Sequence, residues 1–117
     1  MNGFEVMRAE NGEISILHLK GFLDAHTASD LERAVQKLLD EKRFKIVVNF
    51  RELNYISSAG LGVFMGFIEE VRSNGGDIKL TNMIPKIYRV FDLLGFPKLY
   101  EIFNEENQAL QSFKNEK

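Results

Sequence analysis

Two adjacent serines, Ser57 and Ser58, stand just before a strongly apolar segment in the stretch LNYISSAGLGVF. A serine hydroxyl at such a place can cap the first turn of a helix, or it can act as a nucleophile when a base lies beside it. Serine and glycine bury little apolar area, so a requirement other than core filling must select the serines and the two glycines of this stretch.

Helical phase separates the two hydroxyls. Apolar residues recur after the serines at the three-and-four spacing of an amphipathic helix, at Leu61, Phe64, Ile68 and Val71. Extending this phase backwards places Ser57 on the buried stripe and Ser58 on the outer one. Ser57 is therefore predicted to be the helix cap, and Ser58 to be an exposed hydroxyl. Simple capping by one serine remains an alternative, but one cap needs only one hydroxyl.

The outer stripe of this helix is unusual because it contains Gly62 and Gly66. Each interior glycine costs a helix roughly 1 kcal/mol relative to alanine. Two explanations remain open. Another part of the chain could pack closely on this face, or a partner protein could dock over Ser58, Gly62, Met65 and Gly66. Met65 favours docking slightly, since methionine makes adaptable contacts at binding surfaces.

The combination of Asp24, His26 and Ser58 could suggest a hydrolase triad. However, ISSAGLG is not the G-x-S-x-G nucleophile motif, and Asp24 and His26 lie too close together for a typical triad. His18 belongs to the alternating pattern of a predicted strand, on the same face as Ile14 and Ile16, which indicates a structural histidine. With two histidines and no cysteine, the chain has too few ligands to argue for a metal site. We therefore expect no enzymatic activity and no cofactor.

Composition narrows the class of protein further. The chain has 117 residues, 44% of them hydrophobic and 27% charged, which is typical of one folded domain over residues 1–117. Fifteen basic and seventeen acidic residues give a formal charge of -2, so direct nucleic-acid binding is not expected. The longest apolar run, residues 59–68, is about half a membrane span. The first residues, MNGFEVMRAENG, lack the charged start and long apolar core of a signal peptide, so we expect a cytoplasmic protein without membrane insertion.

The serines, Asp24 and the glycines must be positioned by strands and helices, which the sequence pattern predicts. Strands are expected at residues 4–8, 13–24, 44–50, 77–80 and 98–103, the first two joined as a hairpin across AENG, with the chain turning through RELNYI after residue 50. Helices are expected at residues 26–39, 59–76, 85–95 and 104–114. Thr27 and Asp30 have the spacing of a helix cap and its reciprocal partner. The order predicts an α/β fold, with a mixed β-sheet of about five strands packed against about four α-helices.

Two motifs, LNYISSAGLGVF and the upstream GFLDAHTASDLERAV, resemble the STAS-domain family, and within it the bacterial anti-sigma factor antagonists. The resemblance covers nearly the whole chain. Gly21, Leu23 and Asp24 match the G-x-L-D turn that precedes the first helix in this family. Ser58, Gly60, Leu61 and Gly62 match the family's serine before a G-L-G helix start, with Ala59 between the serine and the first glycine.

The resemblance implies that Ser58 is phosphorylated by an anti-sigma factor that is also a serine/threonine kinase, and that a serine phosphatase restores binding. The unphosphorylated form would sequester the kinase and so release a sigma factor, with Asp24 and Ser57 also in the partner-binding surface. Many members carry Asp where this chain has Ser57, and an acidic residue where it has Phe22. These departures bear on which kinase is the partner. The alternative function is a STAS scaffold or regulatory subunit of a signalling or membrane-transport complex, without phosphorylation.

Overall fold

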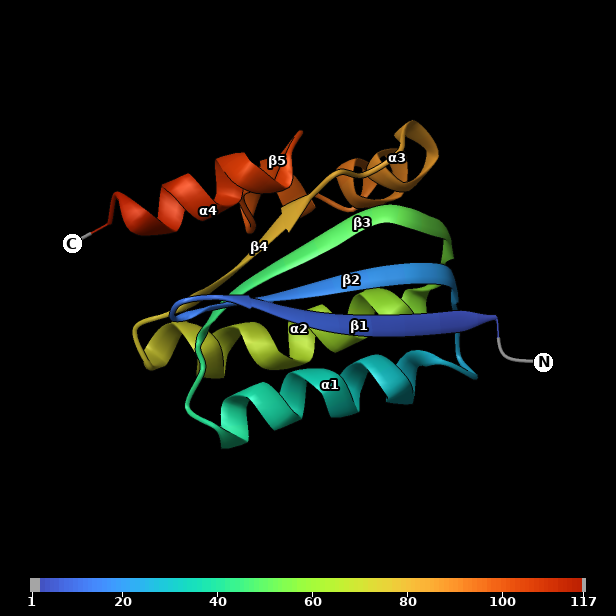
Figure 1. Ribbon diagram of the computed structural model, residues 1–117. Coiled ribbons are helices and arrows are strands. Elements are labelled where there is room, and N and C mark those ends of the chain that lie inside the picture. The colour runs from blue at the N-terminus through green and yellow to red at the C-terminus, as the bar shows by residue number, and fades with distance from the viewer. Residues whose placement is uncertain (1–2, 117) are drawn as a thin grey trace.

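A five-stranded mixed sheet forms the centre of the protein, as seen in the computed structural model, which describes residues 3–116 (Figure 1). The strands lie side by side in chain order, β1 antiparallel to β2 and the others parallel. Their bounds are β1 Phe4–Asn11, β2 Ile14–Leu23, β3 Lys45–Ile56, β4 Asp77–Thr81 and β5 Ile102–Phe103. The predicted α/β fold class is confirmed.

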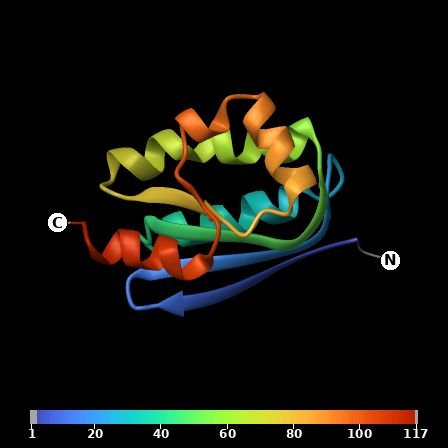
Figure 2. The ribbon, with the colours of Figure 1, turned by 90° about the horizontal axis from the view of Figure 1, so that it is seen from above.

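Four α-helices cover the two faces of this sheet: α1 Ala28–Asp40, α2 Ser58–Ser73, α3 Pro85–Leu93 and α4 Glu106–Lys114. Figures 1 and 2 show α1 and α2 on one side of the sheet and α4 on the other. The buried residues of α3, Ile87 and Phe91, belong to the same apolar cluster as those of α1 and α2. Ala109, Leu110 and Phe113 of α4 pack in a second cluster on the opposite face. A short 3₁₀ helix, η1 Phe96–Lys98, follows α3.

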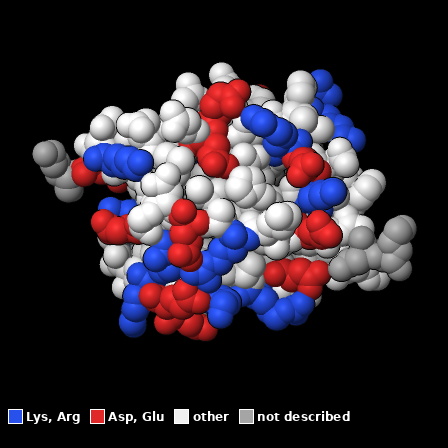
Figure 3. Space-filling model, in the orientation of Figure 1, with Lys and Arg blue, Asp and Glu red and all other residues white. Residues whose placement is uncertain are grey.

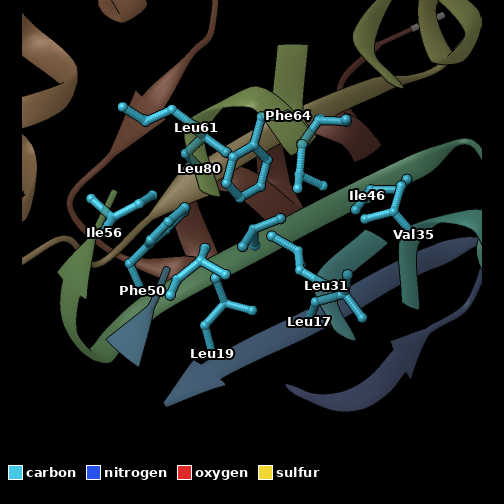
Figure 4. Packing of buried hydrophobic residues seen from close by; sticks show 14 of the residues in the cluster. Leu17, Leu19, Leu31, Val35, Ile46, Phe50, Ile56, Leu61, Phe64 and Leu80 are labelled. Carbon is cyan, nitrogen blue, oxygen red and sulfur yellow. The ribbon is translucent and has the colours of Figure 1, made fainter. Parts of the chain in front are cut away.

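Strand β3 is the central apolar element, because it is buried on both faces over Ile46–Phe50. Figure 4 shows Phe50 and Phe64 within the larger cluster, close to leucines from β2, α1 and α2. The rings of Phe50 and Phe91 meet edge to face, with their centroids 5.4 Å apart. This packing fixes α2 and α3 against β3, and it therefore fixes where α2 begins.

Two predicted strands differ from those observed. The segment RELNYI was expected to be a turn, but β3 continues through it to Ile56 because β2 pairs with it after register shifts, bringing Phe22 opposite Tyr55. The strand expected at residues 98–103 is reduced to Ile102–Phe103. Its first half is instead bent by η1, where the Tyr100 N–H donates to the Phe96 carbonyl at 2.8 Å.

The predicted capping pair at the start of α1 is wrong in its hydrogen bonds. Thr27 occupies the cap position but makes no side-chain cap bond. Its hydroxyl accepts from the Asp24 N–H at 2.9 Å and donates to the Phe22 carbonyl at 2.9 Å. Asp30 pairs with Arg33 instead. The Thr27 hydroxyl therefore stabilises the turn that precedes α1, because that turn offers it both a donor and an acceptor.

Candidate functional site

The site is built where β3 ends and α2 begins. The Ser57 N–H donates to the Leu23 carbonyl at the end of β2 (2.9 Å), and the Ser57 carbonyl accepts from the Leu61 N–H in the first turn of α2 (3.1 Å). Both neighbouring elements therefore hold the Ser57 backbone. The helix starts at Ser58, one residue later. Figure 1 shows this junction at the same end of the molecule as the turn between β2 and α1.

The structure separates the two serine side chains as the helical phase predicted. Ser57 is half-buried, and its Oγ is fully buried without a hydrogen-bond partner among residues 3–116. Ser58 is exposed at the first position of the helix. Of the two adjacent hydroxyls, only that of Ser58 can be reached from outside.

The prediction that Ser57 caps α2 is confirmed for its position and wrong for its hydrogen bond. Ser57 has the extended backbone of a cap residue, with φ -102° and ψ 175°, but its side chain bonds no first-turn N–H group. The first turn of α2 contains no acidic residue either. The N-terminus of α2 thus keeps its partial positive charge without compensation from its own first turn.

The outward stripe, defined here as Ser58, Gly62, Met65 and Gly66, is open. All four residues are exposed, and Met65 retains 47% of its surface. A Cβ atom added at Gly62 or Gly66 would meet nothing within 4 Å. Internal packing against the described part of the chain therefore does not explain these two glycines.

Gly60 differs from the other glycines of α2, although sequence reasoning treated it only as part of a motif. A Cβ at this position would lie 2.7 Å from Leu23 Cγ and 3.1 Å from Ile56 Cγ1. Gly60 is required for the close approach of α2 to the ends of β2 and β3. In the pair formed by Gly60 and Gly62, the first glycine serves internal packing and the second lies on the surface.

Asp24 shapes the turn next to the serines. Its Oδ1 accepts hydrogen bonds from the N–H groups of His26 at 2.9 Å and Thr27 at 3.2 Å. Gly21 lies three residues earlier in β2 with φ +99°, and a Cβ there would lie 1.9 Å from the Gly3 carbonyl oxygen. The G-x-L-D pattern therefore has a structural role, in which Asp24 holds the backbone and glycine permits the close crossing.

Sequence reasoning missed two exposed aromatic residues beside this junction. Phe22 and Tyr55 are 52% and 47% exposed, and their ring centroids lie 6.3 Å apart. They pair across the last residues of β2 and β3. The sequence did not predict that Tyr55 would pair with Phe22, because RELNYI was expected to form a turn rather than to continue β3.

His18 lies on the face of the sheet that α4 covers, and it has the structural role that its strand position indicated. Its Nε2 is 2.9 Å from Glu106 Oε1, and Asn49 Nδ2 donates to the same oxygen at 2.9 Å. These contacts fasten the start of α4 to β2 and β3.

Charges of both signs alternate over the face shown in Figure 3, and they form no broad basic region there. This pattern gives no support to nucleic-acid binding through that face. Within residues 3–116, no helix has the length and apolar character needed to cross a membrane.

Comparison with known proteins identifies the family. The model of the STAS domain matches residues 5–109. The chain belongs to the STAS-domain family.

Several proteins that are similar to this STAS domain in sequence or structure are named anti-sigma factor antagonists. The anti-sigma F factor antagonist of Paenibacillus polymyxa is 28% identical over 98 residues, which cover 83% of this chain and 84% of that protein. An anti-sigma factor antagonist from Mycobacterium paratuberculosis has the same fold, with a TM-score of 0.88 at 19% identity over 96% of this chain and 95% of the other. The phosphorylated form of the Bacillus cell fate determinant SpoIIAA aligns with a TM-score of 0.72 at 22% identity, covering 94% and 98% of the two chains.

Proposed function

We propose that this STAS domain is an anti-sigma factor antagonist, switched by phosphorylation of Ser58. Unphosphorylated, it binds an anti-sigma factor serine/threonine kinase in the cytoplasm and so releases a sigma factor. Phosphorylation by that kinase ends the binding, and a serine phosphatase restores it. The observation that carries the proposal is that Ser58 is exposed at the first position of a long helix, whereas the neighbouring Ser57 Oγ is buried. The names of the relatives support the choice of partner.

A phosphate on Ser58 should leave the fold of the domain intact but weaken binding to the docked partner. It would add roughly -1.5 to -2 charges at a helix N-terminus, where the dipole and free N–H groups favour an anion. The absence of acidic residues from the first turn of α2 removes one source of repulsion. The same charge facing a partner's apolar or acidic surface would need to be desolvated. A cost of about 4 kcal/mol would correspond to roughly a thousandfold in dissociation constant.

The outward stripe supplies the docking surface in this proposal. Gly62 and Gly66 allow another backbone to approach α2 closely, and Met65 adapts to what it contacts. In this proposal Asp24 and Ser57 also contribute to the surface, since the hydrogen bond from the Ser57 N–H to the Leu23 carbonyl brings the turn before α1 next to the start of α2. The domain has no catalytic role, since the kinase and the phosphatase perform the chemistry.

The proposal is tested by incubating the protein with its cognate anti-sigma kinase and ATP. Mass spectrometry should find one phosphate, on Ser58, in both the native protein and the matched Ser57→Ala variant. Circular dichroism should stay nearly unchanged, because the helix N-terminus accommodates the anion. The phosphorylated form should bind the kinase at least about tenfold more weakly, and Ser58→Asp should show part of that loss.

Two outcomes would contradict the proposal. A phosphate on Ser57 would show that the modified residue is wrongly assigned. If neither serine is modified, and Ser58→Asp binds the kinase as tightly as the native protein does, the scaffold or regulatory subunit function should replace the switch.

A further inference from the structure

Two asparagines in the described part of the chain are followed directly by glycine, and both are exposed. Asn11 precedes Gly12 at the end of β1, and Asn74 precedes Gly75 just after α2. Asparagine is a thermally labile residue, because the backbone nitrogen that follows it can attack its side-chain amide carbon. A glycine at the next position favours this attack, since it has no Cβ to crowd the ring that forms. The two pairs share the same local chemistry, so the fold decides which of them reacts.

Hydrogen bonds hold the second pair in the turn that ends α2. The Asn74 side-chain amide donates to the Glu70 carbonyl at 2.9 Å. The Gly75 N–H donates to the Arg72 carbonyl at 3.0 Å. Both bonds satisfy carbonyl groups in the last turn of the helix. The leaving amide and the attacking nitrogen of this pair are therefore both engaged, and the helix end must open before they react.

The corresponding groups of the first pair are free. Among residues 3–116, the Asn11 side chain makes no hydrogen bond and the Gly12 N–H donates none. Gly12 is held only through its carbonyl, which accepts from the Arg43 guanidinium at 2.8 Å. Its φ of +62° suits the first central position of a two-residue hairpin turn, and a Cβ there would meet nothing within 4 Å. The attacking nitrogen thus lies in open space beside an unbonded amide.

We infer that Asn11 is a site of spontaneous deamidation by water. The Gly12 nitrogen loses its proton to hydroxide and forms a bond to Asn11 Cγ. The bond between Cγ and Nδ2 breaks, and the leaving nitrogen takes a proton from water and departs as ammonia, which regenerates hydroxide. Water then opens the five-membered imide. Cleavage at Cγ gives aspartate, whereas cleavage at the backbone carbonyl carbon gives isoaspartate, whose main chain runs through Cβ and Cγ.

Isoaspartate lengthens the backbone of a turn that is fixed on both sides. Asn11 is paired with Ile14 in the sheet, and Arg43 holds the Gly12 carbonyl. An extra backbone carbon between these two contacts prevents both from keeping their present geometry. Strand β1 is the element that should loosen, because β2 is its one neighbour in the sheet of residues 3–116. Figure 1 shows the turn at the opposite end of the sheet from the start of α2, so this inference is independent of the proposed function.

The test ages the purified native protein at mildly alkaline pH and follows each pair by tryptic peptide mapping. Trypsin separates the pairs, which fall on the peptides 9–20 and 73–79, and it places the Asn-Gly pair at residues 2 and 3 on a third peptide, 1–8. Asn11 should deamidate about tenfold or more faster than Asn74. This factor corresponds to about 1.4 kcal/mol, within the range for the one or two hydrogen bonds that Asn74 and Gly75 must break. In urea the two rates should become similar, because only the local sequence then acts.

A matched variant and a structural measurement complete the experiment. Asn11→Gln should leave peptide 9–20 unmodified under the same conditions, because the longer side chain would have to close a six-membered ring. In hydrogen exchange, the isoaspartate fraction of the aged protein should exchange the amides of β1 faster than the unaged protein does. The amides of α2 should exchange at the same rate in both.

Three results would overturn the inference. Equal rates at Asn11 and Asn74 in the native protein would show that the hydrogen bonds after α2 do not decide the site. Reaction of Asn11 in urea but not in the native protein would show that the hairpin protects it. Unchanged exchange of the β1 amides in the isoaspartate fraction would refute the loosening of that strand.

Discussion

The peptide unit between Ser57 and Ser58 joins extended backbone to helical backbone, and this change of direction gives two identical side chains different surroundings. The Ser57 backbone is bonded to Leu23 on one side and Leu61 on the other, which leaves its hydroxyl buried inside the junction without a partner among the described residues. Ser58 begins the helix facing outward. Neither hydroxyl contributes a cap bond, so neither should contribute much to folding.

Alanine at these positions tests that statement. Ser58→Ala should lower the free energy of unfolding by less than about 1 kcal/mol, because an exposed hydroxyl without a cap bond is removed. It should also bind the kinase constitutively. Ser57→Ala should be neutral or slightly stabilising, since it removes a buried hydroxyl that has no hydrogen-bond partner within residues 3–116. Urea denaturation measures both, and a loss of about 2 kcal/mol in either variant would show that its hydroxyl caps α2 in solution.

At the scale of the element, α2 carries two kinds of glycine within one helix. Gly60 lets the helix pack against Leu23 and Ile56, whereas Gly62 and Gly66 face open space. The cost of the last two in helix propensity is not offset by any contact within residues 3–116. A docking role would explain why this cost persists.

Substitution by alanine should give opposite results at the two kinds of position. Gly62→Ala and Gly66→Ala should each raise the free energy of unfolding by up to about 1 kcal/mol, because alanine favours the helix and meets no neighbour. Kinase affinity should fall in both variants, because a methyl group stands where the partner approaches. Gly60→Ala is the matched control and should destabilise the domain, because its Cβ would collide with the Leu23 side chain. Destabilisation by several kcal/mol at Gly62 and Gly66 would refute the docking surface.

At the scale of the whole molecule, contacts between distant segments hold the helices on both faces of the sheet. Lys79 of β4 has no exposed side-chain surface, and its Nζ lies 2.6 Å from both Ser112 Oγ of α4 and Glu116 Oε2 just after that helix. On the other face, the buried Tyr100 hydroxyl donates to the Phe64 carbonyl of α2. Burial raises the pKa of Tyr100 well above its usual range.

This raised pKa predicts a loss of stability at high pH. In the unfolded chain Tyr100 ionises near its ordinary pKa of about 10, whereas in the folded protein it stays neutral. Its contribution is therefore complete below about pH 10 and is lost as the pH rises above that value. Tyr100→Phe should cost about 1 kcal/mol at pH 8 through the lost hydrogen bond, and the gap to the native protein should narrow at pH 11. Urea titrations at both pH values measure this.

The control for the alkaline experiment is Tyr88→Phe, because Tyr88 is exposed on α3. This variant should follow the native protein at both pH values. An equal gap between native and Tyr100→Phe at pH 8 and pH 11 would contradict the buried, hydrogen-bonded state of Tyr100.

The sequence alone determined the fold class, the order of the elements and the outward direction of Ser58, because these follow from the local periodicity of apolar residues along each predicted strand and helix. Tertiary structure decided what depends on contacts across the chain. Pairing with β2 extended β3 to Ile56 and so placed Phe22 opposite Tyr55 as an exposed aromatic pair. Stacking on Tyr100 buried Phe96, which lies between the helix expected at residues 85–95 and the strand expected at residues 98–103. Only the folded chain distinguishes Gly60 from Gly62, because the atoms that would meet a Cβ at Gly60 belong to Leu23 of β2 and Ile56 of β3 and not to the helix itself.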